Sequence, residues 1–113
     1  MYEYRIERIN RIIDGDTLDV AIDVGFHITI NQRTRLGGID APGTRTRDLQ
    51  EKEKGLEAKE WLERKLDTTE PLKIRTEKED KYGRILGWIF IGDDEISINS
   101  HMLEEGYAEP YIP

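Results

Sequence analysis

The sequence contains no cysteine, which excludes a disulfide scaffold, a thiolate zinc site and a cysteine nucleophile. His27 and His101 are the only two histidines, so a centre built from several histidines is not expected. The longest apolar run, Leu86–Ile91, is far shorter than the ~20 residues of a membrane-spanning helix. The first residues, with Arg5 and Arg8, lack the apolar core of a secretory signal. We therefore expect a cytoplasmic protein with no membrane partner.

Basic residues are also in deficit, since 17 Lys and Arg face 24 Asp and Glu for a net charge of −7. A generic basic clamp for nucleic acids would not have this balance. Any positive field must be local, and the segment from Asn31 to Gln50 carries four arginines, namely Arg33, Arg35, Arg45 and Arg47. With 113 residues and 36 % apolar content, the chain is large enough for one small core only. We therefore expect a single domain over residues 1–113.

Alternation of apolar and polar residues predicts three strands before residue 40. The first strand extends from Tyr2 to about Ile13, and its register breaks near Ile9, which indicates a bulge. A second strand covers Leu18–Val24, and Gly25 marks the turn that follows it. The third strand continues at period 2 over Phe26–Leu36. Three strands in direct succession are typical of a meander.

The rest of the chain alternates between helices and strands. Ala58, Leu62 and Leu66 share one face of a predicted helix. The other predicted segments are a polar, mobile loop from Asp40 to about Glu51, strands at Leu72–Thr76 and Arg84–Ile91, a short helix capped by Ser97, and an irregular tail, Tyr107–Pro113. The order β-β-β-α-β-β-α predicts a mainly β protein, a five-stranded OB-fold barrel with flanking helices. An open α+β sheet is the alternative.

Two aspartates flank a glycine in Asp14-Gly15-Asp16, where a tight turn is expected. Carboxylates held by a turn supply the oxygen ligands that hard cations prefer. The alternative is that Asp-Gly serves only as a hairpin turn. Further along, Asp40 follows a strand and precedes the rigid Pro42. It is a second candidate cation ligand, or a plain turn residue.

Two arginines complement these carboxylates. Arg35 lies five residues before Asp40, and Arg84 opens a strand directly after a turn that contains Tyr82. A guanidinium binds phosphate oxygens in bidentate fashion, and a tyrosine ring can stack on a base. Each arginine has an alternative as a solvated or ion-paired surface group, and Tyr82 as a ring packed on the barrel. Together with Asp16, however, the set offers a site for a cation and a phosphodiester, which metal-assisted phosphoryl hydrolysis requires.

Four motifs make the chain resemble the staphylococcal nuclease, or thermonuclease-like, family. They are Ile13–Leu18, Arg35–Pro42, Asp80–Phe90 and Ile98–Ala108, which occur in the order and spacing of the family. The resemblance covers about residues 6–108. It implies an OB barrel, Ca²⁺ as cofactor, and hydrolysis of phosphodiester bonds in DNA and RNA with little base specificity.

The resemblance also implies a role for individual residues. Asp16, Asp40 and the backbone carbonyl of Ala41 would bind calcium, with Asp14 acting behind them through water. Arg35 and Arg84 would contact the scissile phosphate, while Lys81, Tyr82 and Tyr111 would contact nucleotide. We expect a monomer that prefers single-stranded substrate, because a shallow site with a stacking tyrosine suits splayed bases. Short members with an arginine-rich loop resemble phage-encoded forms, which would act in the host cell.

One position departs from the family pattern. Gly43 stands where the family usually has a glutamate that helps to activate the attacking water. General-base help contributes about 10²–10⁴-fold, so a weakened activity is expected. Asp48, Glu51 or Glu53 could replace the missing base, or the water could act with little assistance. The alternatives to an enzyme are a non-catalytic OB module that binds nucleic acid or protein, and a structural barrel that keeps the motifs only as turns.

Overall fold

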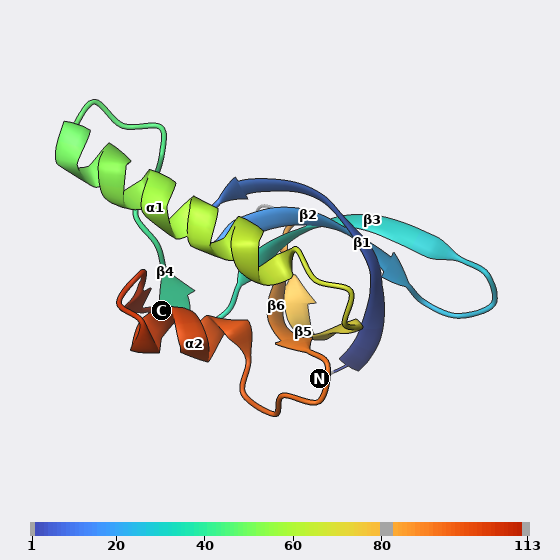
Figure 1. The fold of residues 1–113 in the computed structure, drawn as a ribbon. Helices are drawn as coiled ribbons and strands as arrows, with labels where there is room; N and C mark the ends of the chain where they lie inside the picture. The colour runs from blue at the N-terminus through green and yellow to red at the C-terminus, as the bar shows by residue number, and fades with distance from the viewer. Residues whose placement is uncertain (1, 80–82, 112–113) are drawn as a thin grey trace.

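The computed structural model describes residues 2–79 and 83–111 and has the architecture shown in Figure 1. Seven strands and two helices follow one another in these residues. They are β1 (Tyr2–Asp14), β2 (Thr17–Asp23), β3 (Thr29–Leu36), β4 (Ile39–Asp40), α1 (Leu49–Leu66), β5 (Leu72–Glu79), β6 (Ile85–Ile91), α2 (Ile98–Glu104) and β7 (Glu109–Pro110). No helix of the described residues combines the length and the apolar character that crossing a bilayer requires.

Five strands close into a barrel in the order β1-β2-β3-β6-β5. All neighbours in the barrel are antiparallel except β3 and β6, which pair in parallel over Thr34–Leu36. The predicted OB-type barrel and its element order are therefore confirmed. β4 and β7 stand outside the barrel as a separate two-stranded sheet.

β1 bends so strongly that it pairs with both β2 and β5. Its ladder with β2 shifts register between Ile6 and Arg8, between Ile9 and Arg11, and between Ile12 and Asp14. Each extra residue bends the strand and increases its twist, as closure of a small barrel requires. The bulge expected near Ile9 is confirmed, and two more accompany it.

Both helices pack against the barrel through short apolar faces. α1 begins after Asp48, whose carboxylate accepts hydrogen bonds from the backbone N–H groups of Gln50 and Glu51. α2 begins after Ser97, which caps it as predicted. The buried core joins inward-facing strand residues to the helices; it includes Leu18, Val20, Leu36, Ile74, Ile89, Trp61, Leu62, Ile98 and Met102.

Three segments differ from the sequence-based expectation. The Asp40–Glu51 loop is shorter than predicted, because Asp40 belongs to β4 and the Asp48 cap starts α1 at Leu49. The third strand begins at Thr29 rather than Phe26, since Phe26 and His27 have positive φ angles of 55° and 61° and belong to the turn.

The C-terminal tail is the third correction. It is not wholly irregular, because Glu109 and Pro110 form β7 and pair with β4. A proline lacks the N–H that a central strand needs, and an outer two-residue strand tolerates it. The pairing matters for the site, since Asp40 lies opposite Glu109. The end of the chain thus supports the strand that carries Asp40 (Figure 1).

Candidate active site

The two predicted aspartate motifs meet at one end of the barrel, against α1. Gly15 lies in the turn between β1 and β2, and a Cβ atom there would lie 2.7 Å from the Cβ of Ala58 on α1. The same hypothetical atom would lie 3.1 Å from the Cβ of Ala41. Only a glycine allows the turn, the helix and the Ala41 segment to approach this closely. Sequence motifs that lie 25 residues apart, at Asp16 and Ala41, therefore share one site.

Asp16 is a buried carboxylate with only 8 % of its surface exposed. Its Oδ2 accepts a hydrogen bond from the backbone N–H of Ala41 at 3.0 Å, and its Oδ1 accepts one from the Thr17 hydroxyl at 2.9 Å. Its backbone carbonyl accepts a further bond from the N–H of Leu36. These contacts fix the carboxylate in one orientation and tie it to the segment that carries Asp40.

Arg35 is the centre of the cluster. Its Nη1 donates to the carbonyl oxygens of Leu36 at 3.1 Å and Ile39 at 2.9 Å. Its Nη2 lies 3.1 Å from Asp40 Oδ1 and 3.7 Å from Asp16 Oδ2. A single guanidinium nitrogen thus faces both predicted ligand carboxylates. Because two backbone carbonyls hold Nη1, the side chain keeps a fixed orientation, with 14 % of its surface exposed.

Tyr111 covers the Arg35 guanidinium from the C-terminal side. The guanidinium carbon lies 4.9 Å from the centre of the tyrosine ring, a cation–π geometry. The Tyr111 N–H donates to the carbonyl of Gly38 at 3.0 Å, next to β4. The resemblance suggested Tyr111 as a nucleotide contact, and the structure places it directly beside the predicted phosphate-binding arginine.

Asp14 faces a different partner. Its Oδ1 accepts hydrogen bonds from the hydroxyl of Thr44 at 2.6 Å and from the Thr44 backbone N–H at 3.3 Å. The side chain therefore anchors the loop that leaves the site. In this arrangement the Asp14 carboxylate holds the backbone and the hydroxyl of Thr44, and Asp14 supports the site beside Asp16.

Gly43 packs its backbone against α1. A Cβ atom on Gly55 of α1 would collide with the carbonyl group of Gly43, so the glycine at position 55 is required by this contact. A Cβ atom on Gly43 itself would meet no atom within 4 Å. The position where the family has a glutamate thus faces open space beside Pro42.

The proposed replacements for that glutamate are partly engaged elsewhere. Asp48 caps α1, and Glu51 accepts a hydrogen bond from the Thr46 hydroxyl at 3.3 Å. Glu53 is exposed on α1. A groove of about 560 Å³ does join Asp40 to α1, and it is lined in part by Asp48, Glu51 and Glu57. Of these, Glu57 was not considered from the sequence.

The remaining predicted residues are placed less completely. Arg84 is half-buried and directly precedes β6, two residues before Leu86, which lies opposite Arg35 in the parallel pair. Side chains two residues apart point to the same face of a strand, so the topology places Arg84 on the Arg35 side. Lys81 and Tyr82 lie outside the described residues.

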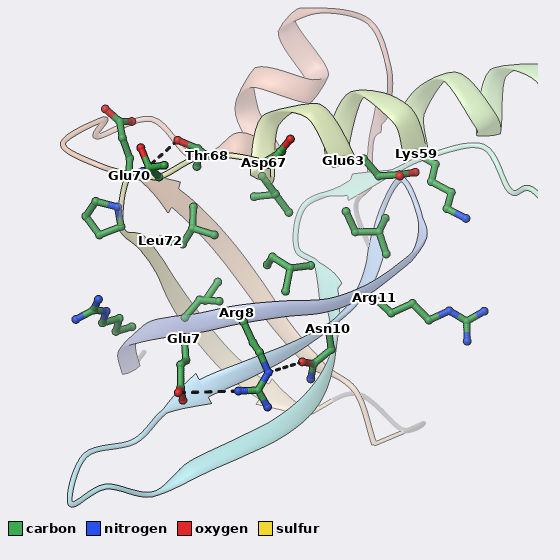
Figure 2. A pocket seen from close by; sticks show the side chains of 17 residues that line it. Glu7, Arg8, Asn10, Arg11, Lys59, Glu63, Asp67, Thr68, Glu70 and Leu72 are labelled. Atoms are coloured by element: carbon green, nitrogen blue, oxygen red, sulfur yellow. Dashed lines mark hydrogen bonds and ion pairs between the residues drawn. The ribbon is translucent and has the colours of Figure 1, made fainter.

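Another groove lies elsewhere, between β1 and the C-terminal end of α1. It measures about 690 Å³ and contains none of the predicted site residues (Figure 2). Within its lining, Arg8 binds Asn10 and approaches Glu7. Its basic side chains are matched by acidic ones, including Glu63, Asp67 and Glu70. This mixture gives no concentrated charge, so we assign the chemistry to the Asp16–Arg35 cluster.

The donor set around Arg35 fits a hard cation. One oxygen of Asp16 and one of Asp40 lie near the same Arg35 nitrogen, and carboxylate oxygen is the donor that Ca²⁺ takes. Among residues 2–79 and 83–111, no three Asp, Glu or His side chains gather closely enough to hold a metal ion. A calcium ion held by Asp16 and Asp40, with the Ala41 carbonyl, would need water to complete its 6–8 ligands.

Comparison with known proteins agrees with the geometry of the site. A model of the family described as staphylococcal nuclease homologue matches residues 33–112 of the chain. The chain belongs to this family. Arg35, Asp40 and Arg84 lie inside the matched range, while Asp14 and Asp16 precede it.

Individual relatives extend the match toward the N-terminus. An uncharacterized protein of Methanocaldococcus jannaschii is 30 % identical over 132 residues, which include 98 % of this chain and 61 % of that protein. A thermonuclease of Staphylococcus intermedius is 29 % identical, with 88 % of this chain and 56 % of that protein covered. A thermonuclease of Staphylococcus hyicus is 30 % identical, with 89 % and 56 % covered. The chain thus spans little more than half the length of these relatives.

Three contacts of the site were not predicted from the sequence. Thr44 binds Asp14, Thr17 binds Asp16, and β7 supports β4. A threonine is common on any surface, and nothing in its neighbourhood reveals a partner 30 residues away. The Glu109–Pro110 pairing is too short to produce a periodic signal.

Proposed function

We propose that the chain is a calcium-dependent nuclease that hydrolyses phosphodiester bonds of DNA and RNA with little base specificity. One observation carries the proposal: the Nη2 atom of Arg35 lies 3.1 Å from Asp40 and 3.7 Å from Asp16. Two carboxylates that can hold a cation therefore stand directly beside a guanidinium that can hold a phosphate. The names of the two staphylococcal relatives, both thermonucleases, support the same activity.

Each site residue would have a separate role in this reaction. Asp16, Asp40 and the Ala41 carbonyl would hold the calcium ion, which when bound neutralises charge on the phosphate and polarises it. Arg35 and Arg84 would bind the phosphate oxygens and stabilise the charge that develops as the water oxygen forms its bond to phosphorus. The ester P–O bond then breaks, and the proton lost by the water is balanced by one gained at the leaving oxygen. Asp14 would act behind the ligands, through Thr44 and water.

Substrate contacts follow from the position of the site. Tyr111, which lies over Arg35, would contact nucleotide, as would Lys81 and Tyr82. A stacking ring beside Arg35 suits the splayed bases of a single strand better than a rigid duplex. We further propose a monomer that acts in the cytoplasm, or in the host cell if phage-encoded.

A second function is favoured by one observation, the glycine at position 43. Without a carboxylate there, the same cluster could bind nucleic acid and not cleave it, as a non-catalytic OB module. The two carboxylates argue against this alternative, because acidic groups beside Arg35 weaken phosphate binding unless a cation offsets them.

Cleavage of denatured DNA by the purified protein separates the two functions. We expect cleavage at alkaline pH with calcium present and none in excess chelator, because the cation offsets the charge of Asp16 and Asp40. We also expect native duplex DNA to be cut more slowly. Binding of an oligonucleotide with no cleavage in either condition would reject the nuclease in favour of the binding module. Equal rates on duplex and denatured DNA would contradict the single-strand preference.

A further inference from the structure

The loop between β4 and α1 alternates threonine and arginine over residues 44–47. Both threonines are engaged within the protein. The Thr44 hydroxyl donates to Asp14 at 2.6 Å, and the Thr46 hydroxyl donates to Glu51 at 3.3 Å while accepting from the Asp48 N–H at 3.2 Å. The loop is therefore fixed at both ends, to the β1–β2 turn on one side and to the first turn of α1 on the other.

The two arginines of this loop have no such partners. Arg45 and Arg47 are exposed, and neither forms a hydrogen bond or an ion pair with any residue that the structure describes. Some other arginines of this acidic chain, in contrast, bind acidic partners. Arg33 binds Asp19 through two bonds of 2.8 and 3.0 Å, and this contact lowers the pKa of Asp19. Arg75 binds Glu3 at 3.0 Å.

The position of the loop next to the site also distinguishes Arg45 and Arg47. The loop starts at Gly43, directly after the Asp40–Pro42 segment of the site, and Thr44 ties it to Asp14. The two arginines are separated by one residue, so their Cα atoms lie at most about 7 Å apart. Two exposed, unpaired guanidinium groups therefore lie on a tethered loop that leaves directly from a site whose other charged groups are mutually engaged.

We propose that Arg45 and Arg47 form a second phosphate-binding site, which contacts backbone phosphates of a single nucleic acid strand next to the phosphate bound by Arg35. The inference rests on the proposed function for the identity of the ligand. It offers a way for a chain of net charge −7 to hold a polyanion, because Arg45 and Arg47 give one tethered loop a local positive charge. Contacts of this kind position the strand and carry no base preference.

Salt dependence of binding tests this site. The probe is a single-stranded oligodeoxynucleotide in excess chelator, where no cleavage occurs, and the variants are Arg45→Gln, Arg47→Gln and the double substitution. Each phosphate contact contributes about 0.7 to the slope of log K against log salt for a single strand. We expect each single variant to lower the slope by about 0.7 and the double variant by about twice as much, with weaker binding at low salt.

Arg64→Gln is the matched control. Arg64 is exposed in the last turn of α1, so its replacement removes the same charge far from the loop. Its slope should equal that of the wild type, and circular dichroism should show the same fold for all variants. A double variant with the wild-type slope would overturn the inference, even if the protein cleaves DNA. A reduced slope in a protein that never cleaves would support the phosphate site while rejecting the nuclease.

Discussion

Replacing Gly43 by glutamate is expected to raise the turnover of denatured DNA by about 10²-fold or more, because general-base help contributes about 10²–10⁴-fold. The structure allows the change. A Cβ atom at Gly43 meets nothing within 4 Å, and Gly43 is not among the residues with positive φ. The backbone contact with Gly55 involves the Gly43 carbonyl and leaves the side-chain direction open. The measurement is kcat with saturating calcium.

Gly43→Gln is the control for this prediction. It has the size and polarity of glutamate but cannot accept a proton at neutral pH, so its turnover should remain close to that of the wild type. Equal gains in both variants would assign the effect to substrate contact rather than to proton removal. No gain in Gly43→Glu, in a protein that does cleave, would mean that another carboxylate already serves as the base. The neighbouring Glu51 and Glu57 would then be the next positions to test.

Arg35→Gln is expected to lower kcat by about 10²–10³-fold, the usual cost of removing one donor that stabilises developing charge. It should also lower the free energy of unfolding in chelator by about 1–3 kcal/mol, because the carbonyls of Leu36 and Ile39 lose their donor. Asp16, which is buried, would lose its nearby positive charge as well. Turnover with calcium and urea unfolding in chelator measure the two effects.

Arg33→Gln provides a comparison on the same strand. Arg33 shares the outward face of β3 with Arg35, but it is exposed and bound to Asp19 rather than to Asp16 or Asp40, so its replacement should leave turnover unchanged. Arg35→Lys should stay nearly as inactive as Arg35→Gln, because a lysine cannot reproduce the forked contacts to the carbonyls and to Asp40. Turnover of Arg35→Gln equal to that of Arg33→Gln would remove Arg35 from the proposed mechanism.

The barrel could be predicted because its strands are long enough to show period 2. Leu18, Val20 and Ile22 alternate without interruption, and each is buried in the structure. The β1 bulge was also visible, since the alternation breaks near Ile9. The shortest strands could not be predicted, for the opposite reason. β4 and β7 have two residues each, too few to show a period. The third strand was predicted too long because the period-2 pattern begins at Phe26, although Phe26 and His27 belong to the preceding turn.

The site was predictable in its composition more than in its contacts. Asp16, Asp40 and Arg35 were chosen because of their motifs, and the structure brings them together. Their mutual arrangement depends on Gly15, whose missing side chain lets the turn approach α1 and Ala41. Such a close approach is decided by packing between distant segments, which a local pattern does not contain. The Tyr111 ring over Arg35 follows likewise from the β4–β7 pairing.

The central claim is that two carboxylates and Arg35 form a calcium-dependent hydrolytic site. The most direct measurement is calcium-dependent cleavage of denatured DNA by wild type, Asp40→Ala and Asp93→Ala, the last an exposed aspartate in the turn after β6. We predict that the wild type and Asp93→Ala cleave at the same rate with calcium, and that Asp40→Ala loses metal-dependent cleavage. Asp40→Ala cleaving as fast as the wild type would contradict the assignment of the site.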